Sequence, residues 1–280
     1  MKIYRYFHNL SLDIVLGALA SSCFAARLFE SNPGLIWWIT LALTVWLLYT
    51  GDHMLDAWRH RKKVEREMHY FMLKQRRLVI YSLGVVAVVN SMLIINLLDK
   101  ELFTHALFLA GLVLLFYAMR HIFRKNRFLF IPGEIFVLLL YLAGTWLGPV
   151  AGLEGTLETS HGLIALIFGG VLFMNLGVIS LYDLQLDSRM GIASLANILG
   201  KKRTKNLLIA TGMGIYMLSV LQFLVFEGDR YTQFALIACG MATIQLLVVY
   251  MPSHFRKNDL FRWTADAALF MGFLSLLIKG

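Results

Sequence analysis

The sequence predicts an all-α, polytopic membrane protein with nine transmembrane helices around a central cavity. Three observations carry this prediction. The 280 residues are 59% hydrophobic and 15% charged, whereas soluble domains are nearer half apolar and a quarter charged. Apolar stretches of about 17–25 residues, the length that crosses about 30 Å of hydrocarbon, follow one another along the chain. Lysines and arginines gather in alternate connecting segments, as they do in multi-pass proteins.

Each span should be a helix, because a lipid-exposed segment must satisfy its own backbone hydrogen bonds. The first span follows Lys2 and Arg5 and has too long an apolar run for a cleaved signal, so we interpret it as a signal anchor. The connecting segments leave no room for a separate soluble domain, so residues 1–280 should form one transmembrane domain. The expected spans are roughly 9–29, 34–58, 77–98, 101–119, 128–150, 161–184, 206–226, 231–251 and 262–279.

The charges indicate an orientation. With a cytoplasmic N-terminus, 22 of the 26 lysines and arginines fall in cytoplasmic segments, and nine spans then leave the C-terminus outside. This bias also accounts for the net charge of +9, so we expect membrane lipids and no nucleic acid as partners. The expected location is a bacterial inner (plasma) membrane. The outer segments keep only Arg27, Lys100, Arg230 and Lys279.

Two pairs of carboxylates lie at cytoplasmic ends of spans. Asp52 and Asp56 end the second span, and Asp183 and Asp187 end the sixth. In each pair the residues are one helical turn apart and share a face. Charged groups at the membrane are costly and mark functional sites by default. Two facing acidic pairs suit cations that hold a diphosphate. The alternative is that each pair anchors its helix through nearby lysines and arginines.

The second pair belongs to a longer pattern. Asp183 and Asp187 are followed by Gly191, by Ser194–Leu195 and by Leu199–Gly200. This pattern resembles the second aspartate motif of the UbiA superfamily of intramembrane prenyltransferases. There a DxxxD is followed by a glycine, a Thr/Ser-Leu pair and a Leu-Gly.

The end of the second span resembles the first motif of the same superfamily, Asn-Asp-x-x-Asp-x-x-x-Asp. Asp52 takes the position of the asparagine, and Asp56 keeps the second aspartate. His53 and His60 stand where the other two aspartates would be. The number of spans, the cytoplasmic position of both motifs and a basic loop between spans four and five extend the resemblance over nearly the whole chain.

The resemblance implies an enzyme that transfers a prenyl group from a polyprenyl diphosphate to a hydrophobic aromatic or lipid acceptor. Asp52, Asp56, Asp183 and Asp187 would be catalytic and would hold Mg²⁺, which neutralises the departing diphosphate. Basic residues could grip that diphosphate, although the positive-inside bias alone would also place them there. The remaining diphosphate-binding candidates are His53, His60, Lys74, Tyr117, Arg120, Arg124, Asn175 and Arg189.

The two histidines in the first motif leave alternatives open. Imidazole binds Mg²⁺ poorly and binds Zn, Fe or Mn well. The face with His53, Asp56 and His60 could therefore hold a transition metal, or the chain could be a UbiA-type terpene cyclase. Another alternative is a non-catalytic protein that binds an isoprenoid or a quinone.

Three further polar residues lie within the expected spans. Asn175 could face the cavity or make a hydrogen bond between helices. Glu134 could accept a proton or pair with Arg127 or Arg124. Asp266, four residues after Arg262, is expected to pair with it.

Overall fold

The computed structural model describes residues 7–59, 67–122, 133–190, 193–226 and 229–278. The helices in these ranges correspond to the nine expected spans, and the structure confirms the all-α prediction. They are α2 (Leu12–Leu28), α3 (Gly34–Arg59), α5 (Arg76–Leu97), α6 (Lys100–Ile122), α7 (Gly133–Ala151), α8 (Thr159–Met190), α10 (Lys201–Val225), α11 (Asp229–Tyr250) and α13 (Leu260–Leu269), which continues as the 3₁₀ helix η3 (Phe270–Leu277).

Seven of these helical segments are long and apolar enough to cross a membrane; the two outside this set are α2, at 17 residues, and α6. The chain is therefore an integral, multi-pass membrane protein. Short elements that the apolar pattern did not predict connect the spans on the side where the lysines and arginines gather. They are α4 (Glu67–Lys74), α9 (Leu195–Leu199), α12 (Pro252–Phe255) and the 3₁₀ turn η2 (Lys257–Asp259).

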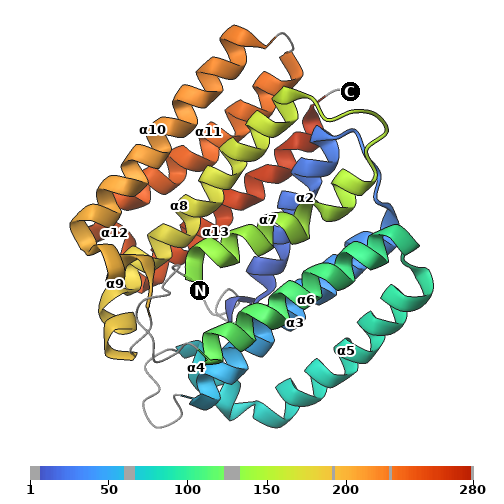
Figure 1. The fold of residues 1–280 in the computed structure, drawn as a ribbon. Coiled ribbons are helices and arrows are strands. Elements are labelled where there is room, and N and C mark those ends of the chain that lie inside the picture. Colours follow the sequence, from blue (N-terminus) through green and yellow to red (C-terminus); the bar gives the residue numbers. More distant parts are fainter. Residues whose placement is uncertain (1–6, 60–66, 123–132, 191–192, 227–228, 279–280) are drawn as a thin grey trace.

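Helix α8 is the centre of the packing (Figure 1). It contacts α7, α10, α11 and α13, and many of its middle residues are buried. Its Gly177 lets α10 come close, because a Cβ at this position would lie 2.5 Å from Cδ2 of Leu208. Small residues at such contacts are the usual means of helix association in membranes. The central position of α8 places the residues of the second motif inside the bundle.

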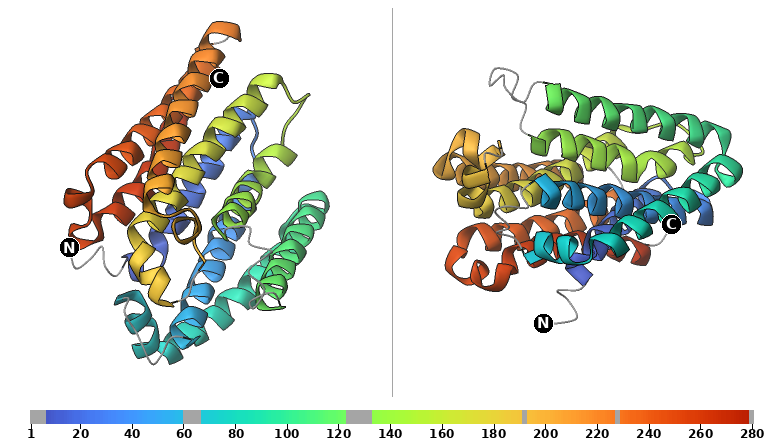
Figure 2. Two further views of the ribbon diagram at one scale, coloured as in Figure 1. Left: turned by 60° about the vertical axis from the view of Figure 1, so that its left-hand side comes forward. Right: turned by 90° about the horizontal axis from the view of Figure 1, so that it is seen from below.

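Helices α5 and α6 lie at the edge of the bundle, on the side away from α10 and α11 (Figures 1 and 2). Helix α5 packs mainly against α3, and α6 packs against α7. Most apolar side chains of α5 are exposed, among them Leu78, Tyr81, Met92 and Ile95. A contiguous apolar face of this size is what a helix presents to lipid.

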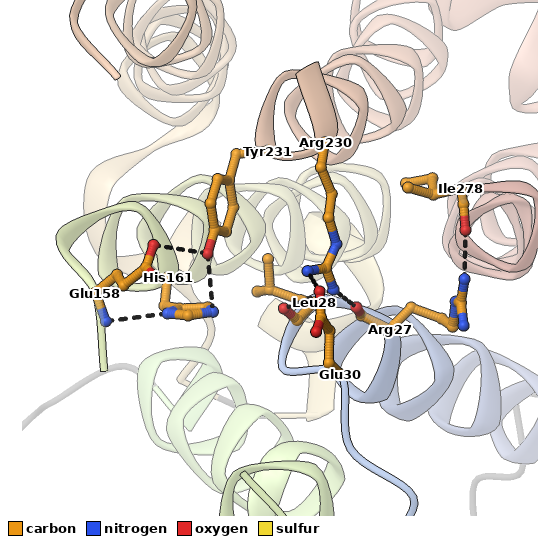
Figure 3. Close-up of polar contacts among 8 residues, drawn as sticks. All are labelled: Arg27, Leu28, Glu30, Glu158, His161, Arg230, Tyr231 and Ile278. Atoms are coloured by element: carbon orange, nitrogen blue, oxygen red, sulfur yellow. Dashed lines mark hydrogen bonds and ion pairs between the residues drawn. The ribbon is translucent and has the colours of Figure 1, made fainter. Parts of the chain in front are cut away.

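One end of the bundle is joined by backbone and charge contacts of two arginines (Figure 3). Arg230 on α11 donates to the carbonyl oxygens of Arg27 and Leu28 at the end of α2, and it pairs with Glu30. Arg27 in turn donates to the carbonyl oxygen of Ile278, just after η3. These contacts satisfy carbonyls that have no partner within their own helices, and so they hold α2, α11 and η3 together.

A second polar group lies beside it and joins α8 to α11. The Tyr231 hydroxyl donates to Glu158 Oε2 at 2.8 Å and lies 3.3 Å from His161 Nε2. The backbone N–H of Glu158 donates to His161 Nδ1 at 3.0 Å. Figure 3 shows all three side chains converging between the two helix starts. Arg27 and Arg230, two of the residues expected on the outer side, thus lie at one end of the bundle.

Candidate functional site

A cavity of about 440 Å³ lies at the opposite ends of these helices. Its size is within the usual range of ligand pockets. The first turns of α2, α7 and α13, the last turns of α3, the second half of α8 and the start of α4 surround it. Its polar lining residues are His8, Asn9, Asp13, Tyr49, His53, His69, Tyr141, Asn175, Asp183, Asp259, Arg262, Trp263 and Asp266.

The second motif contributes one of its aspartates directly. Asp183 lines the cavity, and Asn175, two turns earlier on the same helix, lines it as well. Asp187 is buried one turn further along, beside the lining residue Leu186, but it is not among the described lining residues. Arg189 is exposed near the end of α8. The periodicity of α8 therefore carries Asn175 and Asp183 to the cavity.

The first motif contributes its histidine. His53 lines the cavity together with Tyr49, and the two rings lie 6.5 Å apart on α3. Asp52 and Asp56 are half-buried, and neither is among the described lining residues. His60 lies outside the described ranges. The two motifs thus meet at one cavity through His53 and Asp183, and the roles of Asp52, Asp56 and Asp187 stay predictions.

The predicted basic residues are placed less centrally. Lys74 is exposed at the end of α4 and belongs to a separate surface hollow at the corner with α5. Tyr117 and Arg120 lie on the last turns of α6, where the structure describes the helix but not the side chains. Arg124 is outside the described ranges.

Arg262 lines the cavity, but the sequence analysis did not predict it as a diphosphate-binding residue. Arg262 on α13 forms an ion pair with Asp183 on α8. The sequence had suggested Asp266 as its partner, since the two are four residues apart on one helix. Asp266 instead accepts a hydrogen bond from Asn175 Nδ2 at 3.3 Å. Both pairs cross from α8 to α13, because those helices pack side by side. Asn175 therefore fulfils both of its interpretations, since it faces the cavity and bonds another helix.

A second pair in the cavity was also missed. His8 Nδ1 lies 2.5 Å from Asp13 Oδ2, and Asp13 is buried in the first turn of α2. The signal was present in the sequence, because an aspartate inside a predicted span is itself unusual. His69 of α4, also buried, is a further lining residue that no motif marked.

The segment after the second motif is fixed by two side-chain acceptors. Glu134 Oε1 accepts from the Leu195 N–H at 2.7 Å, and Ser180 Oγ accepts from the Ala196 N–H at 3.0 Å. Both donors are in the first turn of α9, where N–H groups have no partner within the helix. Glu134 therefore acts as a helix cap in this structure. Its two expected ion-pair partners, Arg124 and Arg127, lie outside the described residues.

Within the described ranges, no three histidine, cysteine, aspartate or glutamate side chains form a ready metal cage. Magnesium does not need one, because it typically binds one or two carboxylates together with water and substrate phosphates. The hard oxygens of Asp183 fit that pattern, and the arrangement of Asp187 one turn away on α8 is compatible with it.

No protein-family model matches the sequence, and no curated protein matches it either. A solved structure does match: the apo structure of a UbiA homolog from Aeropyrum pernix K1, with a TM-score of 0.60. The match covers 94% of this chain and 97% of the other, at 16% sequence identity. At this identity the likeness establishes the fold, and the UbiA-like fold that the two motifs implied is confirmed.

Proposed function

We propose that this chain is an intramembrane prenyltransferase that moves a prenyl group from a polyprenyl diphosphate to a hydrophobic acceptor. The observation that carries the proposal is the meeting of the two motifs: His53 and Asp183 line one cavity in a fold shared with a UbiA homolog. Apolar side chains such as Leu138, Leu172 and Ile179 form the rest of the lining and would accommodate an isoprenoid chain.

The charge of the cavity supports a role for magnesium. The described lining residues include one guanidinium, from Arg262, against four carboxylates. A diphosphate would be repelled by this excess of negative charge unless cations accompany it. Bound Mg²⁺ would neutralise charge on the departing diphosphate and so ease the cleavage of its C–O bond. The carboxylates are those of Asp13, Asp183, Asp259 and Asp266.

The Arg262–Asp183 pair is suited to exchange partners when substrate binds. Asp183 and the nearby Asp187 would hold Mg²⁺, and Arg262 would then be released to bind phosphate oxygens, a task for which guanidinium is well shaped. In the substrate-free protein each group neutralises the other, which avoids an isolated buried charge. Lys74, Tyr117, Arg120, Arg124 and Arg189 stay candidates for the outer part of the diphosphate site.

One observation favours the non-catalytic alternative. Of the first motif, His53 and not Asp52 or Asp56 is among the described lining residues. A protein with this arrangement could bind an isoprenoid or a quinone without ionising a diphosphate. The transition-metal alternative at His53, Asp56 and His60 rests on the histidines that replace two aspartates of the first motif, because imidazole prefers such metals.

Release of diphosphate from geranyl, farnesyl and geranylgeranyl diphosphate separates these functions. Purified protein would be compared in Mg²⁺, in EDTA, and in Zn²⁺ or Fe²⁺ after EDTA, with Asp187→Asn as the variant. We expect release that requires Mg²⁺ and is lost in Asp187→Asn while the variant stays folded. Binding without release would favour the non-catalytic alternative. Release restored by Zn²⁺ or Fe²⁺ alone would favour a histidine-based metal site, and a cyclised hydrocarbon product would identify a cyclase.

We also infer that the cavity faces the cytoplasm of a bacterial inner membrane. The cavity and the basic segments share one end of the bundle, and the positive-inside rule places such segments in the cytoplasm. In a background without Cys23 and Cys239, Lys202→Cys and Glu154→Cys place single thiols at exposed positions of opposite ends. A membrane-impermeant maleimide should label position 154 in intact spheroplasts and position 202 only after lysis. The reverse pattern would invert the topology.

A further inference from the structure

The cavity contains a second chemical group that neither motif predicts. His8 and Asp13 lie 2.5 Å apart, Nδ1 to Oδ2, and both line the cavity. Asp13 is buried on α2, and the side chain of His8 is 21% exposed. In this arrangement the carboxylate holds the proton of Nδ1, and Nε2 becomes the basic nitrogen of the ring. A carboxylate-oriented imidazole is the usual form of a general base.

The same cavity contains a second hydrogen-bonding pair. Asp266 on α13 accepts from Asn175 on α8, and it lines the cavity together with Asp13 and His8. The pocket end formed by His8, Asp13, Asn175 and Asp266 therefore offers mainly hydrogen-bond acceptors and stabilises a proton that arrives there. Aromatic and apolar side chains, among them Tyr141, Leu172 and Leu269, adjoin it.

We propose that His8 is the general base for an acceptor that carries a hydroxyl group, and that Asp13 positions it. This inference rests on the proposed prenyl transfer and names its acceptor class, a hydrophobic alcohol or phenol. The acceptor hydroxyl donates to Nε2 of His8. As the oxygen lone pair bonds to the allylic carbon of the prenyl group, the O–H proton moves to Nε2, and diphosphate leaves with the electron pair of the broken C–O bond. Asp13 and Asp266 stabilise the imidazolium until its proton passes to water.

The first experiment tests recognition of the hydroxyl and needs no turnover. The probes are para-hexylphenol and its methyl ether, which differ only in the hydroxyl proton. The wild-type protein should bind the phenol about tenfold more tightly than the ether, about 1.4 kcal/mol. His8→Phe keeps a planar ring but removes the acceptor, so the preference should disappear. His105→Phe, which changes an exposed histidine of α6, is the matched control and should keep the preference. An unchanged preference in His8→Phe would overturn the inference.

The second experiment tests proton removal. With farnesyl diphosphate and para-hexylphenol, His8→Phe should lose transfer to the phenol by at least about a hundredfold. The more acidic para-nitrophenol, which needs less help to lose its proton, should recover much of this loss. Asp13→Asn should show a smaller deficit with the same recovery, because it disturbs the tautomer and leaves the ring.

The two experiments fail in different ways. Wild-type protein could release no diphosphate and still bind the phenol more tightly than the ether, with His8→Phe losing that preference. The proposal of prenyl transfer would then be wrong, and the inferred hydroxyl-binding site would stand. If diphosphate is released and His8→Phe prenylates both phenols as fast as wild type does, His8 is not the general base, and the proposal of prenyl transfer stands. An equal loss for both phenols would show that His8 supports the structure of the cavity only, and would also overturn the inference.

Discussion

Arg262 of α13 donates to the carboxylate of Asp183 on α8. The first aspartate of the second motif is therefore paired with a residue 79 positions further along the chain. Both side chains are mostly shielded, at 21% and 11% exposure. A pair in such a position stabilises little by itself, but the loss of one partner leaves a costly charge behind. The pair therefore connects the stability of the bundle to the charge state of the cavity.

A double-mutant cycle tests this connection. Arg262→Gln should lower the free energy of unfolding by about 2 kcal/mol, because Asp183 loses its counter-charge. Asp183→Asn should also destabilise, and the double variant should be more stable than the sum of the two single effects predicts. Thermal unfolding in detergent gives the stabilities, and diphosphate release gives function. The double variant should regain stability without regaining release. Additive stabilities would show that the two residues do not interact.

The cap on α9 yields a second prediction. Glu134→Ala removes the acceptor of the Leu195 N–H and should cost about 1 kcal/mol of stability. Glu134→Gln keeps an oxygen at the same position and should behave nearly as wild type. Amide hydrogen exchange at Leu195 and Ala196 measures the effect directly, since both N–H groups are held by side chains. If Glu134→Gln exchanged as fast as Glu134→Ala, a charge rather than a cap would be required.

These residues show what the sequence could and could not predict. Apolar length alone placed the nine helical segments, because backbone hydrogen bonding inside lipid leaves no other choice. The face shared by Asn175 and Asp183 also follows from helical periodicity. The partners of these residues do not, because Arg262, Asp266 and Asp13 reach the cavity through the packing of α13 against α8 and of α2 against α13. The short helices α4 and α9 lack an apolar run, so only their contacts reveal them.

A third prediction concerns the close contact between η3 and α2. A Cβ at Gly272 would lie 2.5 Å from the carbonyl oxygen of Ala20 and 2.9 Å from its carbonyl carbon. Backbone atoms cannot move aside as a flexible side chain can, so Gly272→Ala should destabilise by about 1–3 kcal/mol. Gly214→Ala on α10 is the control, because a Cβ there meets nothing within 4 Å. Thermal unfolding of the two variants should separate them clearly, and equal midpoints would contradict the packing of η3 on α2.

The last prediction concerns the altered first motif. His53 lines the cavity with Asp183, at the position where the UbiA pattern has its first aspartate. His53→Asp adds a hard oxygen ligand and a negative charge, so it should strengthen binding of Mn²⁺, a spectroscopic substitute for Mg²⁺, by about tenfold. His53→Asn has a similar size without the charge and should not. Titration of free Mn²⁺ by electron paramagnetic resonance measures both. Weaker binding in His53→Asp, with loss of a metal that co-purifies with wild type, would instead show that the imidazole itself is a ligand.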